Sequence, residues 1–265
     1  LVATGSFKVD AAKMVEKLRE RQLADPEGFI LAWLRCAAAS GAKDIVMTQS
    51  FLGIELFFDG TPFSADELTQ PYQVLLEGDA PEAARGRHFA YGLLAVQRLN
   101  LGWVRVDSTG PQGTAKMAFS RSGKVPDAGA PPESGTRIRV GWPAWIGWWR
   151  GYHAAREARL GYGLGPAKFT LNDVEVPRAP KGWETEKKGG WRAAFKRGSV
   201  GPGASVRVYC LGTFIEEHVV EEASAADAWL ANDALELNIS QTGVRRDKLF
   251  YAGLEFLKHA IYGRP

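Results

Sequence analysis

Few residues of this sequence have the type and spacing that enzyme chemistry needs. Its two cysteines, Cys36 and Cys210, are too few for a disulfide framework or a structural zinc site, and neither lies in a thiol motif. Four histidines lie far apart, with no metal-ligand spacing and no neighbouring nucleophile: His88, His153, His218 and His259. We therefore predict no metal site and no catalytic nucleophile.

Composition and charge narrow the class of protein further. The chain has 265 residues, 45% of them hydrophobic, which suits one large domain or two modest ones. It carries 33 lysines and arginines against 30 aspartates and glutamates, a net charge of +3, so we expect no surface built for nucleic acid. No apolar run reaches the roughly 20 residues of a membrane span, and the first residues do not resemble a signal peptide. We expect a cytoplasmic chain that binds no membrane.

The spacing of apolar residues predicts both helices and strands in the first part of the chain. Helices are expected over 10–23, 26–40, 64–68 and 83–100. Strands are expected over 44–49, 53–59, 103–107 and 137–140. The helix over 83–100 should be broken near Gly86 and Gly92. This order predicts a mixed sheet with helices on one face.

A cluster of glycines and a proline over 161–166 predicts a domain boundary, which divides the chain into 1–165 and 166–265. In the second part, strands are expected over 167–171, 191–196, 205–211, 213–220 and 235–239. Helices are expected over 224–231 and 247–262. A second, smaller α+β unit follows.

Four tryptophans cluster just before this boundary: Trp142, Trp145, Trp148 and Trp149. Such a cluster could form a membrane-interface belt. Because the run is short and Arg150 follows at once, anchoring in the core is the favoured interpretation.

Several short segments, in their order along the chain, resemble the GHKL superfamily of ATP-binding proteins. This superfamily includes type II topoisomerase ATPase subunits, the ninety-kilodalton heat-shock chaperones, sensor histidine kinases and MutL. In the first part, the similar segments are 7–10 (FKVD), 29–40, 54–68 (IELFFDG to SADEL), 86–95 (GRHFAYGLLA) and 134–140 (SGTRIRV). In the second part, 167–173 (AKFTLND) and 235–245 (LELNISQTGVR) are similar to the transducer or chaperone middle domain. The resemblance implies a Bergerat-type α/β sandwich followed by a transducer-like α+β domain.

The same resemblance implies a nucleotide site for ATP or ADP. In this family an aspartate at a strand end accepts the adenine amino group, and glycines let the backbone approach the nucleotide. Asp59 matches that aspartate, with Gly60 beside it, Thr136 reaching toward it, and Gly86 and Gly92 near the phosphates. Taken alone, an Asp-Gly pair at a strand end is a common turn, and that interpretation stays open.

The hydrolytic residues of the family do not carry over. Aligning the buried helix puts Ala32 in place of the water-activating glutamate, Cys36 in place of the magnesium-binding asparagine and Ala39 in place of the following aspartate. Mg²⁺ needs hard oxygen ligands, which alanine and cysteine lack. Pro62 and Phe63 stand where a glycine and a methionine would lie, and their bulk could fill the adenine pocket. We predict no catalytic residue and no metal ligand here.

Three hypotheses about function remain. The first is a degenerate GHKL-like protein that acts as a binding or scaffolding module for protein partners, with weak or no ATP hydrolysis. The second is a chaperone-like or topoisomerase-like ATPase whose base and metal ligand come from elsewhere, such as Glu55 or a partner chain. The third is an α+β protein unrelated to this family. Phosphoryl transfer depends on the metal and on the positioned water, so the missing residues favour the first hypothesis.

Overall fold

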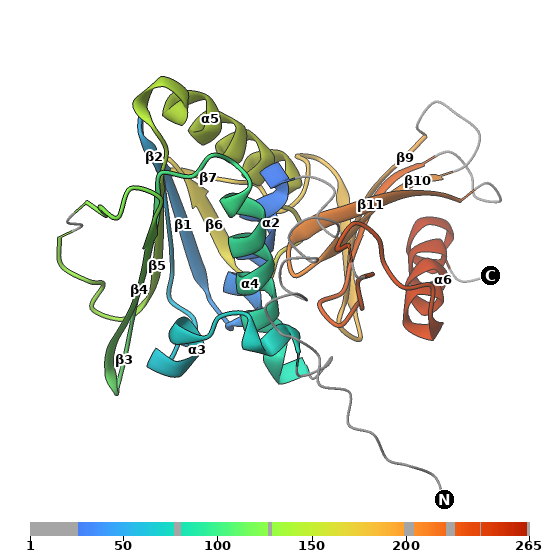
Figure 1. Cartoon of the computed structure of the whole chain (residues 1–265). Coiled ribbons are helices and arrows are strands. Elements are labelled where there is room, and N and C mark those ends of the chain that lie inside the picture. The colour runs from blue at the N-terminus through green and yellow to red at the C-terminus, as the bar shows by residue number, and fades with distance from the viewer. Residues whose placement is uncertain are drawn as a thin grey trace, which may run out of the picture.

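Two β-sheets follow one another along the chain; several helices cover the first, and helix α6 (Lys248–Tyr262) packs on the second (Figure 1). The structure is a computed structural model that describes residues 26–76, 81–126, 129–198, 204–220, 226–238 and 240–263. The helix expected over 10–23 and the segment 7–10 lie outside the described residues.

The first sheet has seven strands in the order β4-β3-β5-β2-β1-β6-β7. The strands are β1 (Asp44–Gln49), β2 (Gly53–Phe58), β3 (Trp103–Gly110), β4 (Gly113–Ser120), β5 (Gly135–Gly141), β6 (Lys168–Leu171) and β7 (Val174–Glu175). Strands β1 and β6 are parallel, and the other neighbours are antiparallel. The mixed sheet predicted from the sequence is confirmed.

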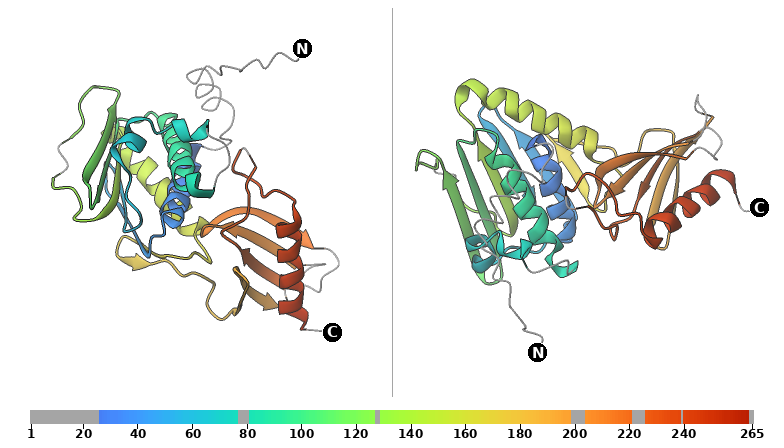
Figure 2. Two further views of the ribbon diagram at one scale, coloured as in Figure 1. Left: turned by 90° about the horizontal axis from the view of Figure 1, so that it is seen from below. Right: turned by 45° about the vertical axis from the view of Figure 1, so that its right-hand side comes forward.

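Helices cover one face of this sheet. They are η1 (Pro26–Gly28), α2 (Phe29–Ala39), α3 (Ala65–Thr69), η2 (Gln73–Leu75), η3 (Pro81–Ala83), α4 (Ala84–Gln97) and α5 (Ala144–Gly161). Helices α2 and α4 lie side by side over the sheet, and α5 crosses the end of this layer (Figures 1 and 2). Phe29, Trp33 and Leu34 of α2 are fully buried in the core beneath them. The α+β fold class with helices on one face, expected from the sequence, is therefore confirmed.

Helix α4 is continuous, whereas the sequence predicted a break near its two glycines. A Cβ atom at Gly92 would lie 2.2 Å from Nε1 of Trp33, so glycine lets α4 approach α2 closely. A Cβ atom at Gly86 would lie 3.4 Å from Val74. Packing against α2 compensates for the weak helix propensity of glycine, about 1 kcal/mol relative to alanine.

Helix α5 was not expected from the sequence, and two of its glycines explain how it packs. A Cβ atom at Gly147 would lie 3.0 Å from the carbonyl oxygen of Phe51, and one at Gly151 would lie 3.4 Å from that of Ser50. Both glycines therefore let the helix lie directly on the turn between β1 and β2. An amphipathic helix usually buries its large apolar residues and exposes polar ones. In α5, glycines lie on the buried face and tryptophans on the exposed face.

The second sheet has five strands in the order β11-β10-β12-β9-β8. Its elements are β8 (Glu184–Lys188), β9 (Trp191–Arg197), β10 (Ala204–Cys210), β11 (Thr213–Val220), β12 (Ala226–Ala231) and helix α6 (Lys248–Tyr262). Helix α6 packs on this sheet, with Phe250 and Leu257 buried against it (Figure 1). Its N-cap Asp247 accepts a hydrogen bond from the Phe250 amide at 2.9 Å.

Two assignments in this unit were wrong. Residues 226–231 form strand β12 rather than a helix, because this alanine-rich segment is paired on both sides by β9 and β10. The described part of 235–239 is not a strand; Leu237 makes only an isolated bridge with Val244. Tertiary pairing overrides local propensity in the first case.

The division between the two sheets does not coincide with the predicted boundary between residues 165 and 166. Strand β6 lies parallel to β1, and its Phe169 is fully buried in the first core. Sheet membership therefore changes between Val176 and Glu184. The segment resembling the start of a transducer domain belongs to the first sheet.

Candidate functional site

Asp59, the predicted adenine-recognition residue, directly follows β2 and is exposed. Its Oδ1 accepts hydrogen bonds from the backbone N–H groups of Lys43 at 2.8 Å and Asp44 at 3.0 Å. One carboxylate oxygen is thus engaged in tying the end of β2 to the start of β1. This geometry is that of a structural turn residue, with its side chain still reachable from solvent.

Gly60 lies against the C-terminal end of α2. A Cβ atom there would lie 1.8 Å from Oγ of Ser40, and the Thr61 amide donates to the Ser40 carbonyl oxygen at 2.8 Å. The glycine is needed because Ser40 occupies the space that a side chain would take. Ser40 is held there by donating to the Ala37 carbonyl oxygen at 2.6 Å.

Thr136, the second residue of β5, pairs with Phe58, the last residue of β2, so the fold brings it to the same end of the sheet as Asp59. Its side chain is fully buried, and its Oγ1 lies 2.8 Å from Oγ of Ser108. The Ser108 hydroxyl in turn accepts from the Phe63 amide at 2.8 Å. Thr136 therefore stabilises the loop after β2 through Ser108.

Gly86 and Gly92 both lie on α4, where the contacts described above are with Val74 and Trp33. Phe63 belongs to the loop after β2 and packs against this helix. Its ring is 4% exposed and lies 4.7 Å, centroid to centroid, from the ring of Phe89 on α4. The fold thus brings Asp59, Gly60 and Thr136 to one end of the sheet, whereas Gly86 and Gly92 lie on α4.

Arg85 lies over the ring of Phe63. Its guanidinium carbon lies 4.5 Å from the ring centroid, within the range of a cation–π interaction. Nη1 donates to the carbonyl oxygens of Thr61 at 3.0 Å and Pro62 at 2.9 Å, and Nη2 pairs with Glu67. This arginine fixes the conformation of the loop that carries Phe63.

The positions on α2 that match the family's hydrolytic residues are apolar and mostly buried. Ala32 is 4% exposed, Cys36 is fully buried, and Ala39 is half-buried. Burial raises the pKa of the Cys36 thiol, so the sulfur stays protonated and is a poor metal ligand at neutral pH. Among the described residues, no group of three or more histidines, cysteines, aspartates and glutamates could hold a metal ion.

Glu55, the alternative base, faces away from this helix. Strand β2 alternates, with Ile54, Leu56 and Phe58 buried in the core and Glu55 on the opposite face. Its carboxylate pairs there with Arg137 at 3.5 Å and Arg139 at 3.4 Å. A water activated by Glu55 would lie on the wrong side of the sheet for a nucleotide beside α2.

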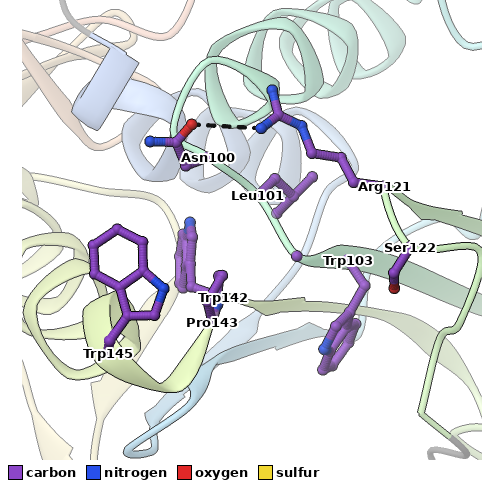
Figure 3. Close-up of a pocket in the computed structure, with 9 residues that line it drawn as sticks. Asn100, Leu101, Trp103, Arg121, Ser122, Trp142, Pro143 and Trp145 are labelled. Atoms are coloured by element: carbon purple, nitrogen blue, oxygen red, sulfur yellow. Dashed lines mark hydrogen bonds between the residues drawn. The ribbon is translucent and has the colours of Figure 1, made fainter.

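A pocket of about 540 Å³, which the sequence did not reveal, lies near the start of α5 (Figure 3). Its lining includes Trp103, Trp142, Trp145, Asn100 and Arg121. Nη1 of Arg121 lies 3.4 Å from Oδ1 of Asn100 across its upper edge in this view. Nε1 of Trp142 has no hydrogen-bond partner within the part of the chain that the structure describes. Aromatic walls of this kind pack against flat or apolar groups.

The tryptophan cluster is not a core cluster. Trp142 is buried, but Trp145 is 79% exposed, Trp148 54% and Trp149 52%. The interpretation as core anchors is therefore wrong for these three. Phe51 and Leu52 of the adjoining turn are also exposed, and we call these five exposed residues the aromatic face. No helix within the described ranges is long and apolar enough to cross a membrane.

The fold is of the α+β class, and packed side chains lie between the loop after β2 and helix α4, the two elements that carry Gly60, Gly86 and Gly92. No protein-family model and no curated protein matches the chain. Among solved structures, the ATPase domain of the bacterial mismatch repair endonuclease MutL from Aquifex aeolicus is similar, at 10% identity and a TM-score of 0.44. The match covers 88% of this chain and 98% of that chain. A likeness at this level identifies no ligand, so the residues themselves must carry the functional argument.

Proposed function

We propose that this chain is a degenerate GHKL-like protein that acts as a binding or scaffolding module for protein partners, with weak or no ATP hydrolysis. The observation that carries the proposal is the inner side of α2, where Ala32 and Cys36 are buried in place of a general base and a magnesium ligand. Without a metal to neutralise developing charge and a base to position water, phosphoryl transfer loses most of its acceleration.

The packing around Phe63 supports the same proposal. The ring fills the space between the loop after β2 and α4, and Arg85 holds that loop in place through two backbone carbonyl oxygens. Nucleotide binding there requires this ring to move, at the cost of its buried contacts.

The aromatic face supports a role in binding a protein partner. Large exposed aromatic side chains on one helix are uncommon on a surface that contacts only water, and tryptophan is enriched at protein interfaces. Trp148 stacks on Tyr152 with ring centroids 6.1 Å apart, so part of this surface is already ordered. Ordered side chains lose less entropy on binding.

A second candidate function is nucleotide binding at Asp59, as in a chaperone-like ATPase. The specific observation in its favour is that Asp59, Gly60 and Thr136 lie at one end of the sheet, as the resemblance implies. The exposed carboxylate can accept a further hydrogen bond.

Calorimetric titration of ADP and ATP, with and without magnesium, separates the two candidates. The binding-module proposal predicts weak or no phosphate release and no nucleotide affinity that depends on Asp59, so wild type, Asp59→Asn and the exposed control Asp173→Asn behave alike. Micromolar binding, about −8 kcal/mol, that is lost only in Asp59→Asn would favour the second candidate. Rapid turnover of Mg-ATP would contradict the first outright.

A further inference from the structure

The pocket of Figure 3 has a wall of aromatic rings. Its volume of about 540 Å³ falls within the range of ligand sites, roughly 300–1,000 Å³. The indoles of Trp103, Trp142 and Trp145 and the ring of Pro143 form this wall. They come from the start of β3, from the connection between β5 and α5, and from the first turn of α5. The pocket therefore lies where one end of the first sheet meets α5.

The sheet holds two of these rings in place. Trp103 lies on β5, because a Cβ atom at Gly141 would be 2.3 Å from Cε2 of the indole. Trp142 is 4% exposed and packs against Phe29 of α2, edge to face, with ring centroids 6.1 Å apart. Its amide donates to the Leu52 carbonyl oxygen at 3.0 Å. Because these rings are ordered before a ligand arrives, binding to them costs little side-chain entropy.

The polar side chains of the pocket are mainly hydrogen-bond donors. Nε1 of Trp142 is buried and has no acceptor within the described ranges. Arg121 carries donors alone, and one of them engages Oδ1 of Asn100 at 3.4 Å, which leaves the two amide protons of Asn100. The Ser122 hydroxyl is shared with that of Ser120 at 3.1 Å. None of the described residues that line the pocket is an aspartate or a glutamate.

This excess of donors narrows the class of ligand. Saccharide hydroxyls bring donors of their own, which would find no carboxylate here, and a cationic ligand would be repelled by Arg121. A proline-rich segment in the polyproline II conformation has the opposite character. Its carbonyl oxygens make no internal hydrogen bonds, proline has no backbone N–H, and the pyrrolidine rings pack on aromatic side chains.

We propose that this pocket binds a proline-rich segment of a protein partner. The prolines pack on Trp103 and Trp145, and the carbonyl oxygens accept hydrogen bonds from the donors of the pocket, Nε1 of Trp142 among them. The inference rests on the proposed function as a binding module and names the chemistry of its partner. Trp145 belongs both to the pocket and to the aromatic face, so a longer partner can continue along α5.

Fluorescence anisotropy of a labelled hexaproline peptide, titrated with the full chain, tests the proposal. A glycine-serine hexapeptide with the same label is the reference, because it has backbone N–H groups and no pre-formed polyproline II helix. We expect hexaproline to bind more tightly than the reference by about tenfold or more.

Trp145→Ala is the decisive variant. Its ring is 79% exposed, so its removal should leave the fold intact, whereas the affinity for hexaproline should fall about fivefold or more. Trp148→Ala is the matched control, because it removes an exposed tryptophan of the same helix that does not line the pocket. It should bind hexaproline as wild type does.

Trp142→Phe tests the buried donor, since it keeps an aromatic ring and removes the indole N–H. We expect its affinity for hexaproline to fall about threefold. An unchanged affinity would contradict the hydrogen bond from Nε1. Should Trp142→Phe not fold, Trp145→Ala with its control still decides whether the pocket is the binding site.

Two results with the peptides would overturn the proposal: equal affinity for hexaproline and the reference, or an equal effect of Trp145→Ala and Trp148→Ala. Sedimentation with vesicles of phosphatidylcholine and phosphatidylserine provides a third. Vesicle binding that both variants abolish, without hexaproline binding, would make this surface a membrane contact instead. The proposed function fails by a different result, rapid turnover of Mg-ATP or nucleotide affinity that depends on Asp59, so the two failures are distinguishable.

Discussion

Phe63 and Phe89 join the loop after β2 to helix α4, with ring centroids 4.7 Å apart and ring planes tilted by 40°. Both rings are almost completely buried. Aromatic pairs at this separation add to the free energy gained from burial. The contact packs two core side chains between the loop that carries Gly60 and the helix that carries Gly86 and Gly92.

Removing this contact should destabilise the protein strongly. Phe63→Ala loses the ring pair and the cation–π contact with Arg85, and we expect the free energy of unfolding to fall by about 3–5 kcal/mol. Urea denaturation followed by tryptophan fluorescence measures the change. Phe51→Ala is the matched control, because Phe51 is 64% exposed and should change stability by about 0.5 kcal/mol or less. A similar small effect for both variants would show that Phe63 is not a core residue.

The two glycines of α4 should respond in opposite ways to alanine. Gly92→Ala puts a methyl group 2.2 Å from the Trp33 indole nitrogen, and overpacking of this kind costs about 1–3 kcal/mol. Gly86→Ala puts it 3.4 Å from Val74, an ordinary contact, and should gain up to about 1 kcal/mol of helix propensity. Unfolding midpoints of the two variants give the sign of each effect. Stabilisation by Gly92→Ala would mean that α4 does not lie this close to α2.

Local patterns predicted much of the fold. The β1–β2 pair follows from alternation, and the N-terminus of α3 follows from Ser64 and Glu67, whose side chains and backbone amides form the capping box. The parallel pairing of β6 with β1 could not be predicted, because it joins residues more than 120 positions apart. The same limit applies to β12, whose strand conformation depends on its two neighbours.

In the candidate site, too, features set by neighbouring residues were predictable from the sequence, and contacts between distant residues were not. The position of Asp59 after a strand was readable from the sequence, but its acceptance of two amide protons from the loop before β1 was not.

The hydroxyl pair beneath the loop after β2 provides a test of whether Thr136 is structural. Thr136→Val keeps the shape and removes the hydrogen bond to Ser108, so we expect a loss of about 1–3 kcal/mol in the free energy of unfolding. Thr109→Val is the control, because the Thr109–Thr114 hydroxyl contact is exposed and contributes little. If Thr136 served only a nucleotide, Thr136→Val would leave the stability of the ligand-free protein unchanged.

Alkaline pH should destabilise the protein through its buried cysteines. Burial raises the pKa of Cys210 from 9.0 to about 12 and also raises that of Cys36. The unfolded chain therefore loses thiol protons from about pH 9, whereas the folded chain keeps them, so the stability that these groups contribute is complete below pH 9 and falls between pH 9 and 12. Chemical denaturation at pH 7.5 and 10 measures the loss, which Cys210→Ala should reduce. In native protein at pH 8, both thiols should react with a thiol reagent only as fast as the protein opens. Rapid labelling of either cysteine would contradict the buried, protonated state and, for Cys36, would reopen the question of an accessible site beside α2.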